Sequence, residues 1–167
     1  MQKTRKILLA FSLLVASSTS TIASTWNYMN VGNETSRYYF DSDTVEKNRE
    51  ITTLWVKIVR TTSPDKEGAW ASAVRWRFNC SKRTIQILTM SDYDKDGTFM
   101  KSYPNSTKED AVIPDSTGEG VLRIACQSDF PRNKSDKDYF ILKNNDVFQA
   151  TRNYVEYKRS QIDEAPK

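Results

Sequence analysis

Asp92, Asp94 and Asp96, followed by Gly97, place carboxylates at alternate positions with a glycine at the sixth, as at the start of an EF-hand calcium loop. In such a loop the twelfth position is a bidentate glutamate, and here it is Tyr103. No helical pattern flanks the segment, and Asp96-Gly97 is typical of a hairpin turn. The sequence therefore favours a plain turn without metal, with calcium binding as the alternative, and we expect no cofactor.

An aromatic and basic surface is predicted by two other segments. Trp55 and Lys57 alternate within one candidate strand, and Arg75 and Arg77 alternate within the next. If the two strands pair in register, all four side chains share one face of the sheet. Arginine above an indole ring is a cation–π arrangement, and such a face could bind an acidic or glycan partner. The alternative is a solvated outer face without a ligand.

Several classes of enzyme are excluded by residue types. The chain contains no histidine, so Ser-His-Asp and Cys-His catalysis and His-ligated metals are ruled out. Its two cysteines, Cys80 and Cys126, are too few for a thiolate zinc site or an iron–sulfur cluster within one chain. The chain has neither a Gly-x-Ser-x-Gly elbow nor a phosphate-binding loop. A glycosidase using two carboxylates is the remaining enzymatic alternative, and we expect a protein that is not an enzyme.

The elements that must position these residues are mostly strands. Short apolar segments between turn residues predict strands at residues 26–31, 37–40, 51–60, 70–80, 83–91 and 98–103. Because the connections are short, the strands should form an antiparallel meander. Ser116-x-x-Glu119 is a capping box that predicts a helix through residue 126. A polar stretch then precedes a second helical pattern at residues 146–161.

The N-terminus indicates export. Basic residues precede a nine-residue apolar run (7–15) and a stretch of small residues, the pattern of a signal peptide over residues 1–24. The run is too short to span a membrane. Removing Lys3, Arg5 and Lys6 with the leader leaves 22 basic residues against 21 acidic ones, so nucleic acid is not an expected partner. No cysteine lies near the expected cleavage site, so we expect no lipid anchor and a location in the periplasm, at the cell surface or outside the cell.

Export also bears on the cysteine pair. In an oxidising compartment two cysteines are most simply one disulfide. Period two places Cys80 on the packed face of its strand, and the helical stripe of residues 121–126 directs Cys126 toward that face. A Cys80–Cys126 bond would tie the helix to the sheet. Closing this loop of about 46 residues should stabilise the fold by about 4 kcal/mol in the chain-entropy model.

The order of these segments is familiar. It comprises a Trp-led first strand, the Tyr38-Tyr39-Phe40-Asp41 patch, the Trp76-Arg77-Phe78-Asn79-Cys80 strand, Ile113-Pro114-Asp115-Ser116-x-x-Glu119, and Ile124-Ala125-Cys126. Together these segments resemble the bacterial surface-adhesin protein E family over about residues 26–127. The resemblance implies an α+β fold: an antiparallel sheet of about six strands, with a disulfide-tethered helix on one face. It also implies a non-enzymatic envelope adhesin that binds host matrix or serum glycoproteins and can form a homodimer.

We therefore expect a signal peptide (1–24), a β+α domain (25–128) and a C-terminal extension with a second helix (129–167). The expected function is that of an exported interaction module. The alternative is a soluble periplasmic protein without adhesin activity that supports the envelope or binds a small ligand between sheet and helix. The second helix could cover the other face of the sheet or serve a partner, and the sequence leaves this choice open.

Overall fold

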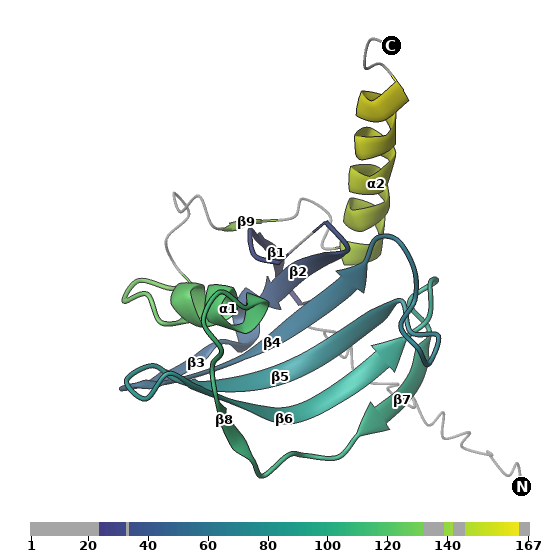
Figure 1. Ribbon diagram of the computed structural model, residues 1–167. Helices are drawn as coiled ribbons and strands as arrows, with labels where there is room; N and C mark the ends of the chain where they lie inside the picture. The colour runs from purple at the N-terminus through teal and green to yellow at the C-terminus, as the bar shows by residue number, and fades with distance from the viewer. Residues whose placement is uncertain (1–23, 33, 132–138, 142–145, 164–167) are drawn as a thin grey trace, which may run out of the picture.

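The computed structural model describes residues 24–32, 34–131, 139–141 and 146–163. Residues 1–23 of the predicted leader lie outside these ranges. Within them the chain forms one nine-stranded antiparallel sheet and two α-helices (Figure 1). The predicted fold class is confirmed, and the described helices lack the combination of length and apolar character that a membrane span requires.

The sheet has the order β7-β6-β5-β4-β2-β1-β9, with β3 and β8 beside it. Its strands are β1 (Trp26–Met29), β2 (Ser36–Asp41), β3 (Glu46–Asn48), β4 (Ile51–Arg60), β5 (Ala71–Asn79), β6 (Thr84–Tyr93), β7 (Phe99–Tyr103), β8 (Glu109–Ala111) and β9 (Tyr139–Ile141). A short 3-10 turn (Ser42–Thr44) separates β2 from β3. All six predicted strands are present.

Three short strands were not predicted, and each extends an edge that a longer strand leaves open. β3 pairs with the start of β4, whereas β2 pairs with the second half of β4. In the same way β8 and β7 pair with opposite ends of β6. β9 pairs with β1 and brings the C-terminal segment into the sheet.

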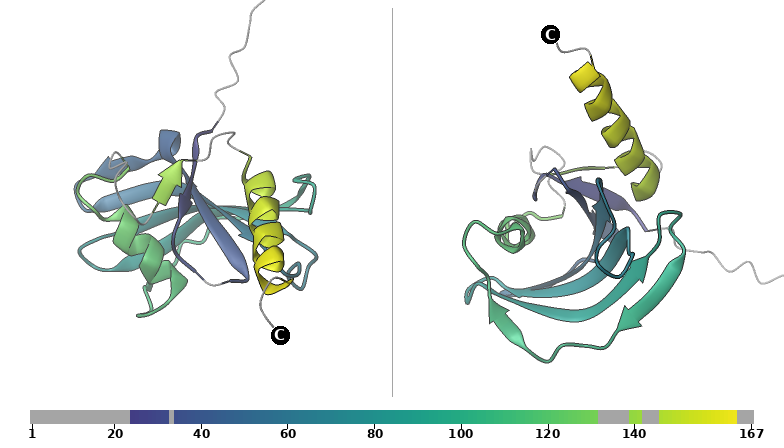
Figure 2. Two further views of the ribbon diagram at one scale, coloured as in Figure 1. Left: turned by 90° about the horizontal axis from the view of Figure 1, so that it is seen from above. Right: turned by 45° about the vertical axis from the view of Figure 1, so that its right-hand side comes forward.

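The inner face of the sheet, which carries the even-numbered side chains of β4 and β5, packs against α1 (Thr117–Ala125). Figure 2 shows α1 inside the curve of the sheet. Leu54, Val56 and Phe78 are fully buried there, together with Val121 and Ile124 of the helix. This cluster is the main core of the protein.

Both features predicted for α1, the capping box and the disulfide, are present. The Ser116 hydroxyl accepts a hydrogen bond from the Glu119 amide at 3.2 Å, and the Glu119 carboxylate accepts one from the Asp115 amide at 2.7 Å. Cys80 and Cys126 are joined by a disulfide. The helix is thus fixed at its start by a cap and at its C-cap, Cys126, by a covalent link to Cys80, the residue that follows β5.

The outer face, which carries the odd-numbered side chains of β4 and β5, holds a second apolar cluster beneath α2 (Val147–Asp163). Tyr39, Val59 and Ala71 are buried there against Val147 of the helix. Figure 2 shows α2 on the opposite side of the curved sheet from α1. The second predicted helix therefore covers part of the second face, and the remaining part bears the predicted binding residues.

Candidate functional site

The predicted aromatic and basic residues do share the outer face. Trp55 of β4 lies directly opposite Arg75 of β5, and Arg77 lies opposite Thr53 on the same face. The Arg75 guanidinium pairs with Glu46 of β3 at 2.8 Å, and Arg77 is exposed. We call Trp55, Arg75 and Arg77 the outer-face patch. It offers an indole ring and, at the end of the face away from α2, a guanidinium (Arg77) that forms no ion pair within the described part of the chain.

Lys57, the fourth predicted residue, lies beside α2 and is half-buried. Its ammonium group lies 4.8, 5.2 and 5.6 Å from the ring centroids of Trp26, Tyr93 and Phe148. Burial lowers the pKa of the Lys57 ammonium from its usual value, and the nearby carboxylates of Asp146 and Asp41 oppose this shift. The cation therefore lies among rings of β1, β6 and α2, and its contact with Phe148 helps to hold the start of α2 on the sheet.

The middle of α2 is held by specific polar contacts. The Tyr39 hydroxyl lies 2.8 Å from the Thr151 hydroxyl, and both side chains are buried. The Arg37 guanidinium lies between two rings, 3.8 Å from the centroid of Tyr28 and 3.9 Å from that of Tyr154. These contacts fix both the position and the rotation of the helix.

A cleft of about 420 Å³ separates α2 from the end of β4, the β4–β5 loop and the β6–β7 turn. We call it the α2 cleft. Its lining comprises apolar side chains (Val59, Trp70, Phe148, Val155), basic ones (Arg60, Lys95, Arg152, Arg159), acidic ones (Asp96, Glu156) and threonines (Thr61, Thr62, Thr151). The volume lies within the range of about 300–1,000 Å³ typical of small-molecule sites.

The candidate calcium residues do not converge. Asp92 is buried and points to the inner face, where it accepts hydrogen bonds from Ser72 and Tyr103. Asp94 begins the β6–β7 turn and accepts from the amides of Asp96 and Thr98. Strand residues two positions apart share one face, but β6 ends at Tyr93 and Asp94 lies in the turn that follows. The two carboxylates therefore diverge although the sequence spaces them as in a calcium loop, because Asp92 bonds within the sheet and Asp94 bonds to the amides of the turn. Among the described residues, no group of three or more acidic or cysteine side chains is arranged to hold a metal ion.

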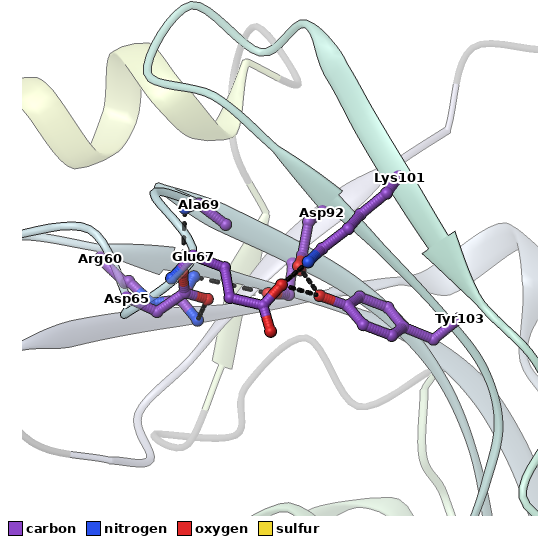
Figure 3. A network of polar contacts seen from close by, with 8 residues as sticks. Arg60, Asp65, Glu67, Ala69, Asp92, Lys101 and Tyr103 are labelled. Atoms are coloured by element: carbon purple, nitrogen blue, oxygen red, sulfur yellow. Dashed lines mark hydrogen bonds and ion pairs between the residues drawn. The ribbon is translucent and has the colours of Figure 1, made fainter.

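Asp92 belongs to a polar network at the end of the inner face away from α1 (Figure 3). Its two oxygens lie 2.7 Å from the hydroxyls of Ser72 and Tyr103. The Tyr103 hydroxyl also lies 3.1 Å from Glu67, which forms an ion pair with Lys101. The hydrogen bond to Asp92 raises the pKa of Tyr103 to about 12. With every carboxylate engaged, this network serves to join β5, β6, β7 and the β4–β5 loop.

The same network extends to the β4–β5 loop through Asp65. Its carboxylate pairs with Arg60 at 2.9 Å and accepts hydrogen bonds from the amides of Glu67 and Ala69. Asp65 therefore closes the loop that forms one wall of the α2 cleft.

Sequence reasoning identified the outer-face patch but missed the α2 cleft. A partial signal was present, because Phe148, Arg152, Val155 and Arg159 follow one another at helical spacing. A stripe that mixes apolar and basic residues indicates a half-covered helix face. The opposing wall comes from three separate segments, which that spacing does not reveal.

Comparison with known proteins gives one family and a structural likeness. No individually curated protein matches the chain. Crystal form II of Haemophilus influenzae protein E has 17% identity and a TM-score of 0.46, covering 59% of this chain and 86% of that one. Protein E from non-typeable Haemophilus influenzae has 17% identity and a TM-score of 0.39, covering 91% and 99%. The sequence profile of the family described as Surface-adhesin protein E matches residues 26–127, more than half of the chain, so this chain belongs to that family.

Proposed function

We propose that this protein is an exported binding module of the bacterial envelope, and that it contacts host matrix or serum glycoproteins through the outer-face patch. The observation that carries the proposal is the pairing of Trp55 opposite Arg75, with exposed Arg77 on the same face. Tryptophan and arginine are the residues most enriched at the energetic centres of protein interfaces. Membership of the adhesin family supports binding rather than catalysis.

The patch is suited to an acidic partner surface. Thr53 and Ala73 are its small neighbours on the same face, and both are buried, so the longer side chains around them form the accessible surface. Glu46 already neutralises part of the Arg75 charge, which leaves Arg77 as the main cation. Binding should therefore combine contact with the indole ring and one charge-assisted hydrogen bond.

The test measures binding of the mature protein to immobilised matrix and serum glycoproteins. We expect Trp55→Ala and Arg77→Glu each to weaken binding by about tenfold or more, as at interface hot spots. Lys66→Glu makes the same change of charge at an exposed loop position and should bind like the wild type. If Arg77→Glu binds as tightly as the wild type, or the wild type binds none of these glycoproteins, the proposal is wrong.

We also propose that two copies pair through β7. This strand lies at one end of the sheet order, and Phe99 and Met100 on it are 57% and 40% exposed. An exposed apolar edge strand is a template for pairing with a second chain. Light scattering after gel filtration should give a dimer for the wild type and a monomer for Met100→Lys. A monomeric wild type at all concentrations would contradict this pairing.

A further inference from the structure

We propose that the α2 cleft is a binding site for an acidic saccharide, a sugar that carries a carboxylate on a polyhydroxylated ring. This site is separate from the outer-face patch, and the inference does not depend on the function proposed for that patch. Three properties of the cleft support it: the available cations, the interspersed carboxylates and the aromatic wall.

The cleft contains cations that form no ion pair with the side chains that the structure describes. Arg159 and Lys95 form no ion pair with another described side chain, and Arg152 donates only to the neutral Gln149 amide oxygen at 2.8 Å. Arg60, in contrast, is paired with Asp65. Arg152 and Arg159 lie about two helical turns apart on α2. Either guanidinium can bind a carboxylate through two parallel N–H donors, the geometry in which arginine binds most strongly.

The acidic residues of the cleft restrict the class of anion. Asp96 and Glu156 lie among the cations, so a ligand dense in negative charge, such as inorganic phosphate, would be repelled by both. Carboxylates accept hydrogen bonds from hydroxyl groups, and so does the exposed Thr62 hydroxyl. A ligand with one acidic group and several hydroxyls satisfies both kinds of lining residue, whereas a fatty acid has no donor for Asp96 or Glu156.

The wall of the cleft offers a flat apolar surface. Trp70 and Val155 are each partly exposed, on opposite sides of the cleft. The C–H face of a sugar ring can pack on an indole while its hydroxyls stay at the polar rim. The contacts of Arg37, Tyr39 and Lys57 hold α2 in place without a ligand, which lowers the ordering cost of binding.

The test titrates the mature protein with a glucuronic-acid-containing disaccharide, followed by calorimetry and by amide and indole chemical shifts. Two comparison ligands are the same disaccharide with its carboxyl group reduced to an alcohol, and octanoate. We expect the acidic disaccharide to shift resonances of Trp70 and α2, and the reduced form to bind about tenfold more weakly, as expected for loss of a charge-assisted hydrogen bond.

The variants are chosen to preserve folding, because Arg152 and Arg159 are exposed. Arg152→Gln/Arg159→Gln should reduce affinity by about tenfold or more. Lys82→Gln, an equal loss of charge at an exposed turn far from the cleft, should leave affinity unchanged. The proposal is overturned if the double variant binds like the wild type, if the shifts map outside the cleft, or if octanoate binds there and the acidic disaccharide does not. Loss of cleft binding with glycoprotein binding intact would support this site independently of the patch.

Discussion

The contacts that dock α2 on the outer face include one buried hydroxyl pair, whose contribution can be tested by substitution. The Thr151 hydroxyl lies 2.8 Å from the Val147 carbonyl, to which it donates, so Tyr39 must be the donor in its 2.8 Å contact with Thr151. Tyr39 and Thr151 are 1% and 3% exposed, so water does not replace either partner. The two hydroxyls therefore form a chain with a defined direction.

This direction predicts unequal effects of the two single substitutions. Thr151→Val, a nearly isosteric change, leaves the Tyr39 hydroxyl buried without its acceptor and should cost about 1–3 kcal/mol. Tyr39→Phe removes one hydrogen bond while Thr151 keeps its bond to Val147, so it should cost about 0.5–1.5 kcal/mol. The double variant has neither hydroxyl, so none is buried without a partner. Its loss of unfolding free energy should therefore be smaller than the sum of the two single losses by about 1 kcal/mol.

Urea unfolding of the disulfide-intact protein measures these free energies, and amide hydrogen exchange reports whether α2 opens with the rest of the chain. A loss of 1 kcal/mol corresponds to about 2–4 °C in Tm for a protein of this size. If the two substitutions are additive within about 0.3–0.5 kcal/mol, the side chains do not interact. The reasoning that makes α2 an integral part of the fold would then be refuted.

Three further predictions concern other parts of the fold. Replacing Cys80 and Cys126 by alanine should lower the free energy of unfolding by about 4 kcal/mol, since the loop of 46 residues is then unconstrained, and urea unfolding with and without reductant checks this. Gly97→Ala and Gly68→Ala should each cost about 1–2 kcal/mol because both residues have positive φ, but the loss should be greater at Gly97, where a Cβ would lie 3.1 Å from an aromatic ring of α2. Because the folded-state pKa of Tyr103 is raised to about 12, its contribution to stability is present below pH 10 and is lost as the pH rises toward 12; the free energy of unfolding of a Phe variant should lack this part of the alkaline decline.

The long strands were predictable because each of their side chains faces one of two contrasting environments. In β4, Leu54 and Val56 enter the main core whereas Trp55 lies on the outer face. The residue types along the sequence therefore alternate with the two faces, and this alternation predicts the strand. β3 and β8 carry no such pattern, because all their residues are exposed. They form because β4 and β6 are longer than their neighbours and leave backbone groups unpaired, a property of the sheet rather than of the segment.

The same distinction between local pattern and distant contact applies to the two helices. α1 was predictable from Ser116 and Glu119, since a capping box is a local feature. The stripe of α2 predicted a helix, but its packing partner Tyr39 is 112 residues distant from Thr151, beyond the reach of any local pattern. The calcium-like spacing of Asp92 and Asp94 misleads because it does not show where β6 ends: Asp92 bonds to Ser72 within the sheet, whereas Asp94 lies past the strand and bonds to amides of the turn.

The outer-face patch and the α2 cleft are physically connected through β4. Trp55, Lys57 and Val59 alternate along one face of this strand, so the patch, the lysine beneath α2 and the floor of the cleft form one continuous row. Release of α2 would therefore expose the Lys57 ammonium next to Trp55 while it removes one wall of the cleft. An increase in positive charge at the patch would accompany loss of the saccharide site, so variants that weaken the Tyr39–Thr151 contact should change the two kinds of binding in opposite directions.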